Sequence, residues 1–179
     1  PPARKNRKTE KTKTANTVQD YFKRQLLFAA NRVKQRVDSN TYHLSLKEFR
    51  QGSNQELLEH VSLLLTAYQL TDQPSYRDSA ANALYYVFGL NPLNQTFVTG
   101  IADNSIRQPY HRFIEATKKM IPGLLVGGAD QYANDGLTPK NRYALSYIDR
   151  AKAFSGNHVN IMYNASLFHT LGMLNAAYN

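Results

Sequence analysis

The spacing of apolar residues in the N-terminal half is the feature that most limits what this 179-residue chain can fold into. From Thr17 onward, apolar residues recur at steps of three and four positions while lysine and arginine fill the other side, which is typical of a surface helix with one buried stripe. The stripe consists of Val18, Tyr21, Phe22, Leu26, Ala29, Val33 and Val37. We expect a helix here, and an all-α fold class if the pattern continues.

The pattern continues in two further segments. Residues 53–71 carry apolar residues at helical spacing and open with Ser53 and Glu56 at the distance of a capping box, in which the two side chains satisfy amides of the first turn. A third helix is expected from about Ser75 to Phe88, before Pro92 disfavours helical backbone at the preceding residue. The sequence therefore predicts three antiparallel helices ahead of the first long loop.

The segment from 92 to 142 has no helical period. Glycine and proline interrupt it at Gly100, Pro109, Pro122, Gly123, Gly127, Gly128, Gly136 and Pro139. Loops of this length in a compact domain are usually functional or disordered, and the apolar centre of the PGLLVG stretch favours a functional one. Two more helices are predicted after it, from about Asn141 to Phe154 and from about His158 to Ala177.

Composition excludes several classes of protein. The chain has no cysteine, which excludes disulfides, thiolate metal sites and cysteine nucleophiles. With 42% hydrophobic residues it suits one domain or part of a larger one. No apolar run approaches the roughly 20 residues of a membrane-spanning helix, and the first residues lack the apolar centre of a secretory signal, so no membrane partner is expected. Because the chain starts with Pro-Pro rather than methionine, we expect a processed or truncated product.

The formal net charge of +9 is concentrated at one end. Residues 1–50 hold 13 Lys and Arg against 4 Asp and Glu, whereas residues 51–179 hold 9 of each sign. Residues 1–14 are basic and poor in apolar side chains, so we expect a flexible tail or linker there, followed by a domain at 15–179. A tail of this kind that binds nucleic acid is a minor alternative.

Several ligand classes lack their usual patterns. The five histidines show no HExxH or comparable spacing, so no metal is expected. Gly127-Gly128 belongs to no phosphate-binding fingerprint and more simply marks a sharp turn, so no cofactor is expected. Four aromatic residues could stack on sugar rings, although the core is the favoured place for them. They are Tyr132, Tyr143, Tyr147 and Phe154.

Three blocks carry a more specific signal than any single residue. They read TFVTGIADNSIRQPYHR, PGLLVGGAD and YIDRAKAFSGNHVNIMYNA, in that order, behind a GSN tripeptide and amphipathic helices. The combination resembles the C-terminal part of the catalytic domain of glycoside hydrolase family nine, from about residue 15 to 179. The matches to the first block are Thr96, Phe97, Val98, Thr99, Gly100, Pro109, His111 and Arg112, and those to the last block are Tyr147, Asp149, Phe154, Asn157, Asn164 and Ala165.

The resemblance implies the later helices of an (α/α)6 barrel, a toroid of six helical hairpins, with long irregular loops between helices. Its expected partners are an N-terminal portion of the same domain and a carbohydrate ligand, and its expected location is secreted or periplasmic. The family's water-activating Asp pair has no counterpart, because no Asp-x-x-Asp occurs in the chain. His158 stands where the family has its catalytic Glu, and Tyr110 stands where it has a substrate-contacting His.

Inverting glycoside hydrolysis needs an acid on one side of the sugar and a base that activates water on the other. The resemblance assigns His158 and Asp149 to the catalytic centre, and an imidazolium with an ordinary pKa of about 6.5 is a conceivable acid. The alternative for His158 is a polar residue that lines an old cleft, and for Asp149 a helical surface carboxylate. Four residues are expected to contact the sugar, namely Arg112, Tyr110, His111 and Tyr147.

The function predicted from the sequence is part of a carbohydrate-active hydrolase-like domain. Its ancestral reaction is the inverting hydrolysis of β-1,4-glucosidic bonds, and this reaction is expected to be weakened or lost, because losing a placed general acid typically costs a factor of about 10² to 10⁴. One alternative is a non-catalytic glycan-binding or scaffold member of the family. Another is the nucleic-acid binder with a basic tail. All versions of the sugar hypothesis require that Arg112, Asp149 and His158 converge on one hollow.

Overall fold

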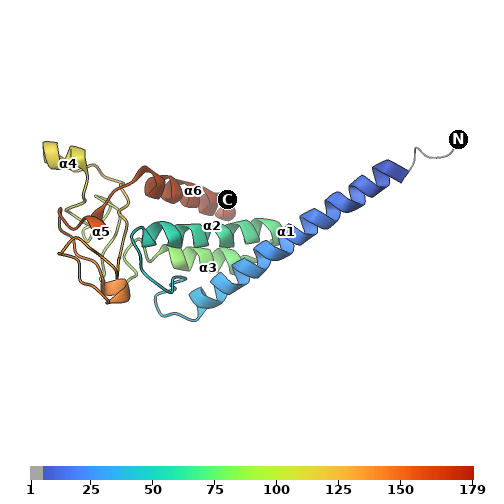
Figure 1. The fold of residues 1–179 in the computed structure, drawn as a ribbon, viewed down its shortest axis with the longest axis horizontal. Coiled ribbons are helices and arrows are strands. Elements are labelled where there is room, and N and C mark those ends of the chain that lie inside the picture. The colour runs from blue at the N-terminus through green and yellow to red at the C-terminus, as the bar shows by residue number, and fades with distance from the viewer. Residues whose placement is uncertain (1–5) are drawn as a thin grey trace.

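The computed structural model describes the backbone of residues 6–179 and the side chains from residue 17 onward. The described chain is helical, which confirms the all-α class, and its sheet-like pairing is limited to isolated bridges. The elements are α1 (Asn6–Asp38), α2 (Ser53–Thr71), α3 (Pro74–Leu84), α4 (Arg112–Thr117), the 3-10 turn η1 (Tyr143–Leu145), α5 (Phe154–Asn157) and α6 (Ile161–Tyr178). Figure 1 shows the long helices at one side and an irregular region at the other.

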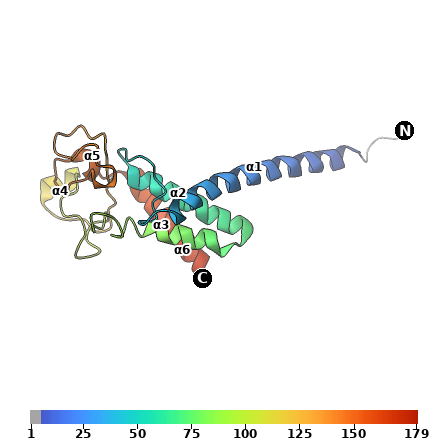
Figure 2. The same ribbon diagram turned by 90° about the horizontal axis from the view of Figure 1, so that it is seen from below.

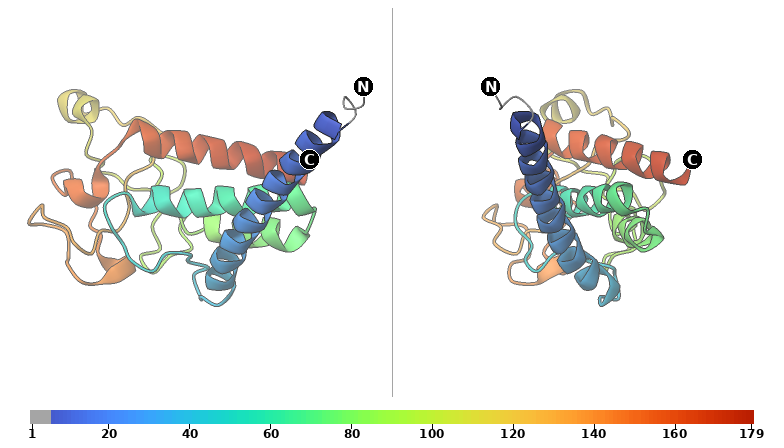
Figure 3. Two further views of the ribbon diagram at one scale, coloured as in Figure 1. Left: turned by 45° about the vertical axis from the view of Figure 1, so that its right-hand side comes forward. Right: turned by 90° about the vertical axis from the view of Figure 1, so that its right-hand side faces the viewer.

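Four helices pack into the part of the fold that the sequence predicts best. Helices α2 and α3 run antiparallel, α6 lies along α2, and α1 crosses the group obliquely, as the two views of Figure 3 show. Their facing sides supply side chains that are fully or almost fully buried, and burial of this apolar area stabilises the packing. Examples are Val33 and Val37 of α1, Leu57, Leu58, Val61, Leu64 and Leu65 of α2, and Ala80, Ala83 and Leu84 of α3.

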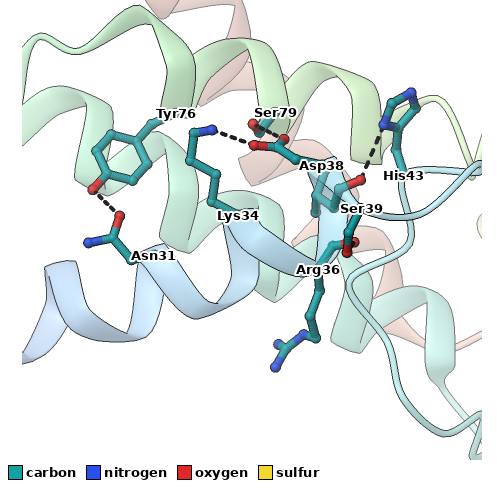
Figure 4. Close-up of polar contacts among 9 residues, drawn as sticks. Asn31, Lys34, Arg36, Asp38, Ser39, His43, Tyr76 and Ser79 are labelled. Carbon is teal, nitrogen blue, oxygen red and sulfur yellow. Dashed lines mark hydrogen bonds and ion pairs between the residues drawn. The ribbon is translucent and has the colours of Figure 1, made fainter.

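The C-terminal half of α1 is tied to α3 by polar contacts (Figure 4). The Tyr76 hydroxyl donates to Asn31 Oδ1 at 2.7 Å, and the Ser79 hydroxyl donates to Asp38 Oδ1 at 2.7 Å. Lys34 forms an ion pair with the same Asp38 carboxylate one turn away. These contacts fix where α1 ends and turns toward α2.

The N-terminal part of α1 extends away from the other helices (Figures 1 and 2). The backbone is helical from Asn6, so residues 6–14 continue α1 where the sequence suggested a flexible tail. Lysine, arginine, glutamate and alanine have good helix propensity even without an apolar stripe, which accounts for this continuation. Residues 1–5 lie outside the described part of the chain, and the division into a tail and a domain at residue 14 stays a prediction.

The start of α2 differs from the predicted capping box. Gly52 is the N-cap, with a left-handed backbone at φ 87°, and no side chain caps the helix. Ser53 is already helical, and its hydroxyl donates to the Gly127 carbonyl oxygen at 3.5 Å. The Ser53–Glu56 capping box is therefore wrong, because the serine hydroxyl points at the glycine-rich loop rather than at its own helix.

The helix predicted from Asn141 to Phe154 is also wrong. Only the short turn η1 forms there, and Asn141 and Tyr143 have positive φ angles of 55° and 50°, which stop a right-handed helix. The carbonyl groups of the following residues do not form an intrahelical ladder. Those of Ile148 and Arg150 accept hydrogen bonds from the Asn157 side-chain amide instead. Side-chain competition for the backbone replaces the helix.

The irregular region from residue 85 to 160, which we call the loop half, is held together by short backbone pairings. Isolated bridges join Thr96 to Ser105, Val98 to Leu125, Tyr110 to His158 and Val126 to Val159. The side chains of Phe97, Leu125 and Val126 are fully buried and extend the helical core into this half. None of the helices between residues 6 and 179 is long and apolar enough to cross a membrane.

Candidate functional site

The two residues at which the chain departs from the expected family pattern lie side by side. The Tyr110 N–H donates to the Asn157 carbonyl oxygen at 2.8 Å, and the Val159 N–H donates to the Tyr110 carbonyl oxygen at 3.3 Å. This pairing forms a parallel bridge between Tyr110 and His158, whose ring centroids are 6.2 Å apart. His158 stands in extended backbone ahead of α6, and not in a helix as expected.

Two further aromatic rings complete a cluster around this pair. The Phe154 ring centroid lies 6.3 Å from that of Tyr110, and the Tyr163 ring meets His158 edge-on at 6.2 Å. We call Tyr110, Phe154, His158 and Tyr163 the aromatic cluster. Tyr110 and Phe154 are each 39% exposed, so part of their apolar surface faces solvent. Exposed aromatic faces of this kind suit the apolar face of a sugar ring.

The glycine-rich block supplies the backbone behind the cluster. The Gly127 N–H donates to the His158 carbonyl oxygen and the Gly128 N–H donates to the Gly156 carbonyl oxygen, both at 3.0 Å. Gly128 has a φ of 89°, and a Cβ there would lie 2.6 Å from the Asn54 side chain. Only glycine fits this position, because the backbone is left-handed and the space is already filled. The GSN tripeptide and the GG pair are thus in direct contact.

Asn157 links the cluster to the core. Its side-chain oxygen accepts a short hydrogen bond from the Tyr147 hydroxyl, while its amide donates to two carbonyl groups of the preceding loop. Tyr147 is 5% exposed, its ring packs edge-on against Phe97, and burial raises its pKa well above the ordinary value. Its position favours the core interpretation of this tyrosine, and its predicted sugar contact stays untested.

Asp149 acts on the backbone next to the cluster. One carboxylate oxygen accepts from the Arg107 N–H at 2.7 Å and the other accepts from the Gln108 N–H at 2.9 Å. Asp149 is therefore a loop residue. It is not a surface carboxylate on a helix, which was the alternative to a catalytic role. Its contacts position the segment that leads to Tyr110, and none of them joins it to His158.

Arg112 is the first residue of α4 and is exposed. Its side chain makes no hydrogen bond or ion pair with any other residue in the described chain. Helix α4 and helix α5, which begins at Phe154, lie at the same end of the molecule in both Figure 1 and Figure 2. The structure thus brings Tyr110 and His158 together, whereas the convergence of Arg112, Asp149 and His158 on one hollow stays a prediction.

His111 lines a cavity that the sequence did not predict. It is the N-cap of α4, and its Nδ1 atom is buried without a hydrogen-bond partner. His111 and Tyr110 line a cavity of about 360 Å³. Its other lining residues are Arg107, Gln108, Pro109, Ile114, Glu115, Lys118, Met120, Ala151 and Lys152. Several of them lie within the motif blocks, but the sequence does not show that the two segments enclose a cavity.

Two aspartates of the loop half have shifted pKa values of opposite direction. Burial raises the pKa of Asp130, which accepts a hydrogen bond from the Tyr132 N–H. Burial also acts on Asp135, but the hydrogen bonds that it accepts from Thr138, Leu137 and Ser155 outweigh this effect and lower its pKa to about 2. Across residues 17–179, no three histidine or carboxylate side chains gather in a way that could hold a metal ion.

The packed helices with a long-loop face belong to the class of (α/α)6 barrel fragments. The family model for glycosyl hydrolase family 9 matches residues 3–171, and the chain belongs to this family. A solved metagenome-derived endoglucanase of glycoside hydrolase family 9 superposes with a TM-score of 0.84 at 32% identity, over 90% of this chain and 29% of that one. The thermostable endoglucanase of Alicyclobacillus acidocaldarius gives a TM-score of 0.80 at 28% identity, over 88% and 32%.

Curated relatives give the same result. The xyloglucan-specific endo-β-1,4-glucanase of Bacteroides ovatus is 30% identical over 166 residues, which is 88% of this chain and 28% of the relative. The cellodextrinase of Butyrivibrio fibrisolvens is 28% identical over 155 residues, which is 79% of this chain and 28% of the relative. The chain therefore spans less than a third of the length of these curated relatives.

Proposed function

We propose that residues 15–179 form the C-terminal part of a family 9 domain whose cleft binds β-1,4-linked glucosides and whose hydrolytic activity is weakened. An N-terminal portion of the same domain completes the cleft. The observation that carries this proposal is the pairing of Tyr110 with His158 inside the aromatic cluster. Tyr110 and His158 are the two departures from the family pattern, and because they form one bridge, both substitutions affect the same site.

The names of the relatives support the substrate class. They are a cellodextrinase, an endoglucanase and a xyloglucan-specific endo-β-1,4-glucanase, and the last of these names states the β-1,4 linkage. The aromatic cluster supports the same class, because sugar rings stack on exposed aromatic faces. Arg112 would donate its forked N–H groups to sugar hydroxyls, and Asp149 would hold the backbone beside the bound sugar.

The chemistry of His158 supports the weakened reaction. A glutamic acid at this position protonates the leaving oxygen in the family mechanism, whereas an imidazole has a different reach and a different donor direction. Its environment consists of the Tyr110 and Tyr163 rings, and no carboxylate contacts it in the described chain. A site that binds the glycan but lacks a well-placed acid would lose a factor of about 10² to 10⁴ in rate.

A gain-of-function experiment tests this proposal. In the full-length protein, we expect His158→Glu to raise reducing-sugar release from soluble β-glucan by about 10² or more, and His158→Ala to leave the low wild-type rate unchanged. A high wild-type rate that His158→Ala abolishes would instead make His158 the working acid. This result would contradict the proposal that hydrolysis is weakened, while the proposed substrate class would still hold.

Glycan binding is measured on the same variants by affinity electrophoresis in β-glucan gels. Tyr110→Ala should weaken retention by about 5- to 10-fold, since an aromatic stacking partner contributes about 1 kcal/mol. Tyr85→Ala is the matched control, because this tyrosine is 54% exposed and belongs neither to the aromatic cluster nor to the cavity lining. If neither wild type nor variants are retained, the carbohydrate function itself is wrong.

The same proposal includes a secreted or periplasmic location. Polysaccharide chains do not cross membranes, so a protein that binds them has to meet them outside the cytoplasm. Cell fractionation with an antibody against residues 15–179 tests this, and a signal confined to the cytoplasm would contradict it.

A further inference from the structure

The cavity beside Tyr110 has the size of a ligand site. Its volume of about 360 Å³ is within the range of roughly 300 to 1,000 Å³ that is usual for small-ligand pockets. The lining contains the apolar residues Pro109, Ile114, Met120 and Ala151. It also contains charged residues from α4 and from two loop segments. A lining that is both apolar and charged suits a sugar-sized ligand that carries a charge.

The charged residues of the lining are predominantly cationic. Arg107, Lys118 and Lys152 line the cavity together with a single carboxylate, Glu115. None of the three cations forms an ion pair in the part of the chain that the structure describes, and the Arg107 guanidinium donates only to the Asp103 carbonyl oxygen, at 3.4 Å. Elsewhere, Lys34, Arg50 and Arg77 do pair with carboxylates. The lining therefore carries an excess of positive charge that forms no ion pair within the described chain.

The cavity lining also includes an imidazole. His111 is partly exposed and is one of the lining residues, while its Nδ1 atom is buried and has no hydrogen-bond partner. The lining thus combines an imidazole with the three cations, which suits a polar ligand better than a purely apolar one.

The cavity adjoins the aromatic cluster at Tyr110, which belongs to both. We propose that it is a subsite for a carboxylate carried by the glycan, as in a uronic acid residue next to the sugar that stacks on Tyr110. The planar fork of Arg107 matches a carboxylate, and Lys118 and Lys152 add charge around it. This assignment rests on the proposed function and specifies its substrate as an acidic glycan.

The test compares two ligands on the full-length protein by isothermal titration calorimetry. The ligands are cellohexaose and a cellohexaose in which the 6-hydroxymethyl groups are oxidised to carboxylates. We expect the carboxylated ligand to bind about 10-fold more tightly at low salt, since three partly exposed charge pairs each contribute a factor of a few. The preference should shrink at 0.3 M NaCl because salt screens exposed charges.

The double variant Lys118→Ala/Lys152→Ala should reduce the preference to about two-fold or less and leave cellohexaose binding unchanged. The matched control is Lys119→Ala/Lys140→Ala, which removes the same charge from exposed lysines outside the cavity. The control should keep the full preference. Both pairs are exposed, so neither is expected to disturb folding.

The outcomes separate this inference from the function it rests on. Equal binding of both ligands by the wild type overturns the acidic subsite while the carbohydrate function stands. A preference that survives the cavity variant, or that the control variant also loses, overturns the subsite as well. Binding of neither ligand overturns the carbohydrate function. A sulfated cellohexaose that binds as tightly as the carboxylated one overturns the assignment to a carboxylate in favour of any anion.

Discussion

The helical half and the loop half of this chain are stabilised in different ways. In the helices, buried leucine, valine and alanine side chains face one another and few polar groups take part. In the loop half, single polar side chains each hold several backbone groups. Asn91 is an example, because its amide donates to the Tyr86 and Gln95 carbonyl oxygens while its oxygen accepts from two N–H groups.

The comparison explains where the site can form. Irregular backbone leaves N–H and C=O groups without secondary-structure partners, and buried groups of this kind have to be satisfied in another way. Asn157, Asp149 and Asp135 satisfy them one by one. The resulting backbone is specific enough to hold Tyr110 beside His158, and the helices provide the base on which it rests.

The largest expected effect tests the helical half. Leu64→Ala removes a fully buried side chain from α2 and should lower the free energy of unfolding by about 3 to 5 kcal/mol, because it leaves a cavity among packed neighbours. Leu70→Ala on the same helix is the control, since Leu70 is 41% exposed and should lose less than about 1 kcal/mol. Urea unfolding of the full-length variants measures both. Similar losses for the two would mean that apolar packing does not govern this half.

The next effect tests the loop half at its contact with α2. Gly128→Ala should cost about 2 to 4 kcal/mol, because the left-handed backbone strains an alanine and its Cβ would meet Asn54 at 2.6 Å. The control is Gly136→Ala, which has a φ of 74° and open space around it, and which should cost only about 1 to 2 kcal/mol. The difference between the two variants in urea unfolding isolates the steric contact. Equal losses would show that the Asn54 contact adds nothing.

The same division decides how much of the fold can be predicted from sequence. The helical spacing of apolar residues identifies α2, α6 and the packed part of α1, because the residues that a helix buries recur every three or four positions. The helix expected from Asn141 does not form, because Asn141 and Tyr143 have positive φ angles and the Asn157 amide takes the Ile148 and Arg150 carbonyl groups. The capping box at Ser53 fails for a related reason, because Gly127 takes the hydroxyl. Contacts between distant segments leave no local pattern.

The candidate site follows the same rule. Motif spacing singles out Tyr110 and His158, because both lie in blocks that resemble the family pattern, and the structure pairs them in one bridge while their roles stay predictions. It also selects Asp149, whose observed contacts are with the backbone at Arg107 and Gln108. It misses the cationic cavity, because the motifs assign no role to Lys118 or Lys152 and do not show that their two segments enclose a cavity.

The smallest of these effects concerns the pH dependence of the loop half. The pKa of Asp135 in the folded state is about 2, below the ordinary value of an aspartate, so its ionised form favours folding. This stabilisation is complete above the unfolded-state pKa of about 4 and is lost as the pH falls through about 2. Asp135→Asn turns an amide toward the Thr138 hydroxyl and the Ser155 N–H, both of which donate to the present carboxylate. We expect a loss of about 1 to 2 kcal/mol at pH 7, discounted for partial exposure to solvent.

Asp130→Asn provides the control with the opposite sign. Burial raises the folded-state pKa of Asp130, so its ionisation opposes folding, and the neutral asparagine can still accept the hydrogen bond from the Tyr132 N–H. This variant should be as stable as the wild type or more stable at pH 7. Thermal unfolding at pH 7, 4, 3 and 2 should show the Asp135→Asn deficit shrinking toward zero at the acid end. A deficit that is independent of pH would mean that the shape of the Asp135 side chain, and not its charge, holds this loop.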